Sequence, residues 1–246
     1  MTETRHYPNA PITEAILDLR VFPRPDIKLD ELKKVIAGEE TAFAQAEPVH
    51  VITGQIILTD TSTTSNPLNT QVGYIFRHKD GRYIHQARTD GFTISQLPKY
   101  TSWKDLEREG RRRWAIYREV VQPLGISRVA LRYVNRIDVA DPLTNIDDYL
   151  HTNPHIAPGL PQTIDGYFMQ VSIPFPKIEG HAIITETIIP PATPGVVSIV
   201  LDIDVFKQFP APVTDDEAWS TLNNIHNLKN EIFEACITDK ARELFA

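Results

Sequence analysis

The alternation of apolar and polar residues predicts that the chain begins with a half-exposed β-strand. From Thr13 to Val21 the apolar residues alternate with Glu14, Asp18 and Arg20. A period of two is typical of a strand that has one face against a core and the other in water. Pro23 ends the pattern, since proline does not continue a ladder of hydrogen bonds. We expect a short helix over residues 29–36 to follow.

The next segments favour strands and turns. Residues 49–58 have the composition of a second strand, and the polar residues Asp60 to Asn69 predict a loop. Residues 71–77 and 82–88 flank Asp80-Gly81, and Asp-Gly between β-rich runs indicates a hairpin. Residues 91–97 continue as an extended chain.

Two long helices are predicted, one in each half of the chain. Ser102 is a suitable N-cap for a helix from Trp103 to Val121, which carries apolar residues at helical spacing. A last helix is expected from Asp216 onward, with Trp219 and Cys236 on its apolar side. Between these helices the strand patterns cover Arg128–Val139, Tyr167–Ile173, His181–Ile189 and Val196–Phe206.

Similar residues recur in the same order at a spacing of about 116 residues. Arg20 and Arg136 are 116 apart, as are Trp103 and Trp219. The spacing is 117 for the pair Asp30 and Asp147, and 114 for the pair Asp90 and Asp204, each of which precedes a phenylalanine by two positions. We interpret the series as an internal duplication of residues 1–125 and 126–246, each with the order β-α-β-β-β(-β)-α.

The resulting fold class is α+β, with long helices on one face of an antiparallel sheet. Two such halves side by side form a saddle or a helix-grip-like structure, as in folds related to the TATA-binding protein. The alternative is two separate αβ domains. We favour one compact, pseudo-symmetric unit because no flexible linker separates the halves, Gly125 being the only hint of one.

Composition is that of a globular protein with a large core. Of 246 residues, 41% are hydrophobic and 23% are charged, which is ordinary for this class. No apolar run approaches the roughly 20 residues of a membrane helix, and residues 1–6 do not have the pattern of a signal peptide. A single cysteine excludes an internal disulfide. We therefore expect a cytoplasmic protein without membrane contact.

Few motifs indicate chemistry. The chain has no Gly-x-Ser-x-Gly, Walker loop, Gly-x-Gly-x-x-Gly or His-Glu-x-x-His sequence, so nucleophilic catalysis, nucleotide binding and zinc hydrolysis have no local signature. His151 and His155 are four apart, but Pro154 between them indicates a loop rather than a ligand pair on one helix. We expect no catalytic residue, no metal and no cofactor.

The polar face of the first strand of each half is the candidate site. We expect five residues to bind a ligand, with the arginines as contacts and the aspartates orienting them: Arg20, Arg132, Arg136, Asp18 and Asp138. Guanidinium groups on one surface suit carboxylates or phosphates. The alternative is a network of Arg–Asp pairs that ties the two halves together. Both interpretations predict partly buried arginines.

Four segments carry a family resemblance: Tyr7–Ala15 (YPNAPITEA), Leu97–Trp103 (LPKYTSW), Leu131–Ile137 (LRYVNRI) and Ile237–Lys240 (ITDK). Together they resemble a sporadically distributed, uncharacterised prokaryotic protein family, over almost the whole chain. The resemblance implies an accessory prokaryotic gene, mobile or defence-related. It implies no catalytic residues.

These features favour a non-catalytic binding protein that uses the exposed sheet face and adjoining loops. The expected partner is another protein or a small anionic ligand, and open sheet edges are compatible with a homodimer. A first alternative is a saddle that binds nucleic acid, which the net charge of −7 disfavours. The basic run Arg111–Arg113 is diluted by nearby glutamates. A second alternative is a hydrolase or nuclease with carboxylates on the sheet face.

Overall fold

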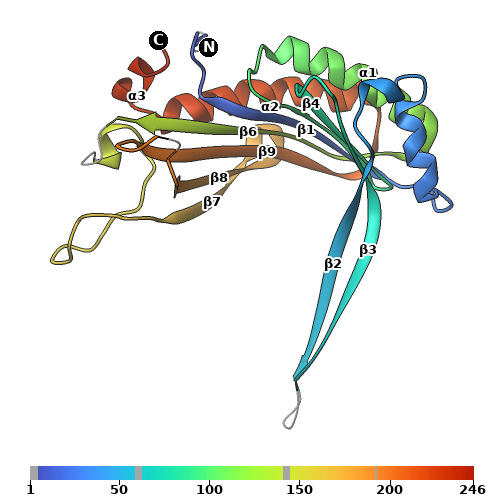
Figure 1. Cartoon of the computed structure of the whole chain (residues 1–246), viewed down its shortest axis with the longest axis horizontal. Helices are drawn as coiled ribbons and strands as arrows, with labels where there is room; N and C mark the ends of the chain where they lie inside the picture. Colours follow the sequence, from blue (N-terminus) through green and yellow to red (C-terminus); the bar gives the residue numbers. More distant parts are fainter. Residues whose placement is uncertain (1–4, 59–62, 141–144, 192) are drawn as a thin grey trace.

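A computed structural model describes residues 5–58, 63–140, 145–191 and 193–246. In this part of the chain nine strands form one antiparallel sheet in the order β2-β3-β4-β5-β1-β6-β9-β8-β7 (Figure 1). The strands are β1 (Ile12–Phe22), β2 (Glu47–Leu58), β3 (Thr63–Arg77), β4 (Tyr83–Arg88), β5 (Gly91–Gln96), β6 (Gly125–Val139), β7 (Phe168–Phe175), β8 (Gly180–Ile189) and β9 (Val197–Val213). The predicted α+β class and antiparallel sheet are confirmed.

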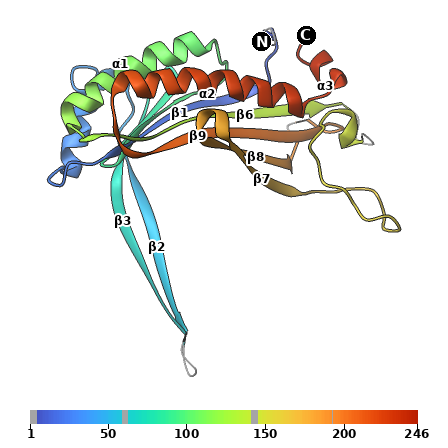
Figure 2. The same cartoon turned by 180° about the vertical axis from the view of Figure 1, so that it is seen from behind.

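Two long helices lie on the same face of this sheet (Figures 1 and 2). They are α1 (Trp103–Val121), which packs on β1 and β5, and α2 (Asp215–Cys236), which packs on β6 and β9. Short elements complete the chain: α3 (Asp239–Glu243) and the 3-10 turns η1 (Leu29–Ile36), η2 (Glu40–Ala42), η3 (Ile146–Asp148) and η4 (Pro176–Ile178). No helix of the described residues is long and apolar enough to cross a membrane.

Capping and close packing fix the long helices. The hydroxyl of Ser102 accepts a hydrogen bond from the Asp105 amide, and the hydroxyl of Thr214 does the same for the amide of Glu217, which satisfies donors that each first turn leaves free. Gly110 lets α1 approach β1, because a Cβ atom there would lie 3.2 Å from the side chain of Leu17. Helix α1 begins at Trp103 and ends at Val121, so its predicted start and end are confirmed.

The core lies between the helices and the sheet. Odd-numbered residues from Ala15 to Val21 in β1 and from Val129 to Val139 in β6 face the helices, and Leu17, Leu19 and Leu131 are completely buried there. Successive strand residues point to opposite faces, so Asp18 and Ala130 face away from the helices in the register of β1 and β6. We call this second side of the sheet the open face, because no helix of the described chain covers it (Figure 2).

The β2–β3 hairpin leaves the sheet as a projecting arm. Pairing between β3 and β4 begins only at Gly73, whereas β2 and β3 pair with each other out to Leu58 and Thr63. The arm extends on the side opposite to the helices (Figure 1). The predicted polar loop over residues 60–69 is wrong from Thr63 onward, while residues 60–62 lie outside the described residues. Residues 51–53 and 68–70 are exposed, and a strand exposed on both faces needs no apolar alternation, which is why residues 68–69 resemble a loop in sequence.

The duplication was inferred from similar residues at a regular spacing, but not all of these residues have equivalent positions in the structure. Phe92 is buried against Tyr117 of α1, whereas Phe206 lies on the open face beneath the guanidinium of Arg128. These two phenylalanines, which follow Asp90 and Asp204, therefore face opposite sides of the sheet, and their proposed equivalence is wrong. A shift of one residue in strand register reverses every side chain, and the sequence spacing does not detect it.

Candidate functional site

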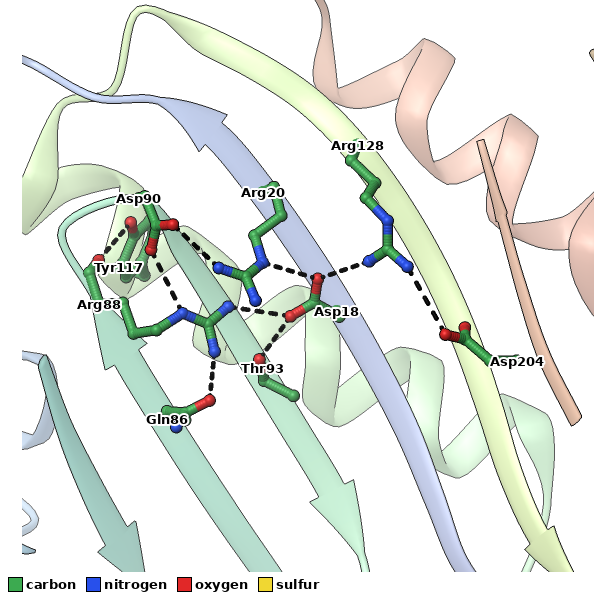
Figure 3. A network of polar contacts seen from close by, with 9 residues as sticks. All are labelled: Asp18, Arg20, Gln86, Arg88, Asp90, Thr93, Tyr117, Arg128 and Asp204. Carbon is green, nitrogen blue, oxygen red and sulfur yellow. Dashed lines mark hydrogen bonds and ion pairs between the residues drawn. The ribbon is translucent and has the colours of Figure 1, made fainter. Parts of the chain in front are cut away.

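Asp18 is the centre of an ion-pair network on the open face (Figure 3). Its carboxylate accepts hydrogen bonds from Arg20 at 3.2 Å, Arg88 at 3.0 Å and Arg128 at 3.1 Å. The hydroxyl of Thr93 donates a fourth bond at 2.7 Å. Since β1 lies between β5 and β6, its neighbours bring Thr93 and Arg128 to either side of Asp18. The Asp18 side chain is 13% exposed, so this carboxylate is well shielded.

Two more aspartates close the network at its ends. Asp90 binds Arg20 at 2.9 Å and Arg88 at 3.3 Å. On the other side Arg128 lies 3.6 Å from the Asp204 carboxylate and 4.5 Å above the centroid of the Phe206 ring. The network thus holds three arginines and three aspartates in alternation (Figure 3).

The arginines decide the ionisation of Asp18. Burial alone would raise the pKa of this carboxyl, but the guanidinium groups of Arg88 and Arg20 outweigh it and hold the pKa below the ordinary value. Asp204 is different: burial raises its pKa, Arg128 and Arg132 oppose that effect, and Asp202 and Asp18 add to it. One carboxylate oxygen of Asp204 is buried without a partner among the described residues. Asp204 is therefore the least satisfied acid of the network.

The other predicted arginines form separate pairs along β6. Arg132 binds Asp202 through two nitrogens, with its Nε 2.9 Å and 3.0 Å from the two carboxylate oxygens. Arg136 donates to Asp138 at 2.9 Å and to Ser198 at 3.1 Å. Arginines four positions apart on a strand are separated by roughly 13 Å along it. The pairs are therefore neighbours of the Asp18 network rather than parts of one pocket.

The structure brings together some of the predicted residues and not others. All five lie on the open face, where Asp18 and Arg20 share the network and Arg136 and Asp138 form a separate pair. Arg88 and Arg128 were missed, although strand alternation places Arg128 on the same side as Arg132. The aspartates Asp90, Asp202 and Asp204 were also missed as partners of the arginines. Their roles depend on strand register, for which the sequence contains no local signal.

The arginines of the open face are balanced by carboxylates. Five arginines pair with five aspartates: Arg20, Arg88, Arg128, Arg132 and Arg136 with Asp18, Asp90, Asp138, Asp202 and Asp204. A wide depression of about 510 Å³ adjoins the network, lined in part by Arg20, Phe22 and Arg128. The face consequently presents ordered donors and acceptors without a positive field.

The basic run on α1 is neutralised in the same way. Arg111 binds Glu107 at 2.8 Å, and both Arg112 and Arg113 bind Glu109 and Glu39. Arg113 is only 3% exposed. These side chains form an ion-pair cluster between α1 and the loop before η2.

Chemistry by metal or thiol has little geometric support. Among the described residues, no group of three His, Cys, Asp or Glu side chains is placed to hold a metal ion. Cys236 is buried, and burial raises the pKa of its thiol to about 11, so the thiolate that reacts as a nucleophile is scarce at neutral pH.

A buried carboxyl lies on the helix side of β8. Glu186 is 0% exposed, and neither of its oxygens has a well-formed hydrogen bond within the described chain. Burial raises its pKa to about 7, and Tyr167 lowers it by less. The folded protein therefore binds more protons than the unfolded chain between pH 4.5, the ordinary value, and pH 7, and its stability falls as the pH rises through this window.

We expect Glu186→Gln to remove this decline and to stabilise the protein at pH 8 by about 2 kcal/mol, because the amide is never ionised. Urea unfolding at pH 5 and pH 8 measures the effect. Glu231→Gln on the exposed side of α2 is the control, and it should leave the pH dependence unchanged. Equal behaviour of the two variants would contradict the raised pKa.

The comparisons with known proteins do not assign the chain to a group. No model of a protein family matches it, and no curated protein is significantly similar to it.

Proposed function

We propose that this chain is a non-catalytic protein-binding module of a prokaryotic accessory system, and that the partner docks on the open face. The observation that carries the proposal is a broad sheet face that no helix of the described chain covers and on which the charged side chains are already ordered (Figures 1 and 3). A preorganised surface loses little side-chain entropy on binding.

The composition of the open face suits a protein partner. Half-buried Ile16, Val134 and Val200 lie between the ion pairs, so apolar area and hydrogen-bonding groups are mixed, as in interfaces between proteins. The Arg132 side chain is 49% exposed and that of Arg20 is 37% exposed, which leaves donors for a partner. The balance of charges is a weak basis for binding nucleic acid, whose affinity depends on uncompensated positive charge.

We also infer that the two halves are related by internal duplication. With η2, η4 and α3 left aside, the chain runs β-η-β-β-β-β-α and then β-η-β-β-β-α, and the sheet order is mirrored about the β1–β6 pair. The N-caps Ser102 and Thr214 support a spacing of 112 residues. On this reading residues 1–125 and 126–246 are the repeats, and one strand is absent from the second. The mirrored sheet then acts as a shallow saddle.

A photo-crosslinking amino acid at Val134, in the middle of the open face, tests the proposal in cells of the source organism. The control places the same amino acid at Ala115, which is exposed on α1. We expect a discrete protein adduct from Val134 and not from Ala115. Identical adducts from both positions, or adducts to nucleic acid only, would contradict the proposal.

Exchanging the two residues of one ion pair tests partner recognition while it keeps the ion pair within the fold. The double variant Arg132→Asp with Asp202→Arg keeps an ion pair across β6 and β9 but reverses the charge presented to a partner. We expect wild-type stability and an adduct yield reduced by about tenfold, the size of one lost interfacial charge contact. Arg136→Asp with Asp138→Arg is the matched exchange near the end of β6. Full adduct yield from the first exchange would mean that Arg132 is not a contact.

A further inference from the structure

The outer part of the arm has two free edges. Beyond Val72, whose carbonyl still accepts from the Thr89 amide, the strands β2 and β3 pair only with each other, so the far side of each strand has no paired strand among the described residues. An isolated two-stranded ribbon is marginally stable in water. The arm therefore gains stability from any strand that is added to one of its edges.

The sequence of the arm contains almost none of the charged residues that usually protect an edge strand against such pairing. From Pro48 to Phe76 the only residue charged at pH 7 is Asp60, in a chain in which 23% of residues are charged. Natural edge strands carry charges, especially lysine, which prevent copies of the same protein from pairing. Val51 is 46% exposed and Ile52 is 70% exposed. As neighbours on a strand they point to opposite faces, so apolar groups are uncovered on both sides.

Two prolines show which edge is available. A proline has no N–H and fits a ladder only where its nitrogen faces away from the paired strand. Pro67 of β3 is paired with Gly54 of β2, so its nitrogen faces the outer edge of β3 and leaves a missing donor there. Pro48 of β2 is paired with Tyr74 and places its missing donor at the base of the arm. From Val49 to Leu58 the outer edge of β2 has no proline and no charge.

The same prolines define the outward-facing residues of β2. The nitrogen of Pro48 faces outward, and Gly54, opposite Pro67, faces outward as well. These positions have the same parity, so His50, Ile52 and every second residue to Leu58 direct an N–H and a C=O away from β3. The free edge therefore offers a regular series of donors and acceptors.

We propose that this edge pairs with the β2 edge of a second copy of the chain, antiparallel and about a twofold axis close to Gly54. Self-pairing places identical residues near each other across the axis. This is tolerated because residues 49–58 have no charged side chains that would repel each other. The open face takes no part in this contact. The proposal is therefore independent of the proposed function, and each can fail without the other.

The other edge of the sheet is the competing surface. Strand β7 is uncharged as well, and Phe168 there is 71% exposed. It has 8 residues against 12 in β2, and Pro174 interrupts its second half. From Val49 to Leu58 the edge of β2 is longer and has no proline or charged residue, so it is the better pairing surface.

Sedimentation velocity of the full chain across a concentration series tests the proposal with paired proline variants. Ile52→Pro removes an outward N–H from the free edge, and Asn69→Pro removes one directly opposite on the edge of β3. Neither N–H is used inside the hairpin. We expect wild type and Asn69→Pro to sediment at twice the 27.9 kDa chain mass. We expect Ile52→Pro to weaken the dimer by about tenfold or more, because a carbonyl in each copy loses its donor.

Two lysine variants cover the case in which a proline disturbs the arm. Ile52→Lys adds a charge at an exposed position on the free edge, and Phe168→Lys adds one on the edge of β7. Loss of the dimer with Ile52→Lys alone supports the proposal. A monomeric wild type, a dimer that survives both changes at Ile52, or a dimer lost only with Phe168→Lys would overturn it.

Discussion

Replacing Asp18 with alanine is expected to lower the free energy of unfolding by about 3–5 kcal/mol, the cost of leaving a buried ionic partner uncompensated. Asp18 accepts bonds from Arg20, Arg88 and Arg128. The side chain of Arg88 is only 7% exposed, so without Asp18 its charge is poorly solvated and keeps only the Asp90 carboxylate, at 3.3 Å. Urea unfolding at pH 7 measures the change.

Asp138→Ala is the matched control for this substitution. It removes an aspartate of the same face that is 49% exposed and paired with Arg136, so the expected cost is below about 1 kcal/mol. If both variants lose the same small amount of unfolding free energy, the Asp18 network does not stabilise the sheet. Its ordered arginines would then be retained for a ligand.

The acid limb of the stability curve gives a second measurement on Asp18. Its pKa is lower in the folded protein than the ordinary value of 3.8. The stabilisation is therefore complete above pH 3.8 and is lost as the pH falls through the folded-state pKa. The alanine variant should consequently lose less stability than the wild type on acidification below that value.

Replacing Lys229 with methionine is expected to stabilise the protein at pH 7 by about 3 kcal/mol, because a charge is no longer buried. Lys229 is 6% exposed on the sheet side of α2, and no described carboxylate pairs with its ammonium group. The nitrogen lies 3.7 Å from the centroid of the Tyr133 ring, which recovers part of the cost. Methionine has a similar length and no charge to solvate.

The pH dependence of the stability tests whether the buried charge of Lys229 is the cause. Burial lowers the pKa of Lys229 from 10.5 to about 7, so the unfolded chain binds more protons between these values. Wild-type stability should therefore rise from pH 7 to pH 10, and the rise should be absent in Lys229→Met. Lys104→Met on the exposed side of α1 is the control. A less stable Lys229→Met would mean that Tyr133 and the ammonium group form a net favourable pair.

Local signals in the sequence predicted the elements well. Ser102 and the apolar stripe that follows it marked α1, and Asp80-Gly81 marked the turn between β3 and β4. Alternation along β1 placed Asp18 and Arg20 on the open face. These features depend on neighbouring residues, for which propensity and periodicity are sufficient.

Contacts between distant residues could not be predicted in the same way. Asp18 binds Arg88 and Arg128, which are 70 and 110 positions away, and their meeting depends on the register of four neighbouring strands, β4, β5, β1 and β6. A register error of one residue would have turned Arg128 toward the helices. The outer part of β3 was also missed, because exposed residues such as Leu68–Thr70 show no alternation of the kind that marks a buried face.

The place of β1 in the sheet has a consequence for the order in which the molecule folds. It precedes β5 and β6 in the sequence, yet it lies between them, where Leu17 is paired with Ile94 on one side and Leu131 on the other. Such pairing has a high contact order, and the entropy of closing these long loops slows folding. While β6 is still on the ribosome, one edge of β1 has no strand beside it. The nascent first half therefore exposes its central strand until the second half arrives.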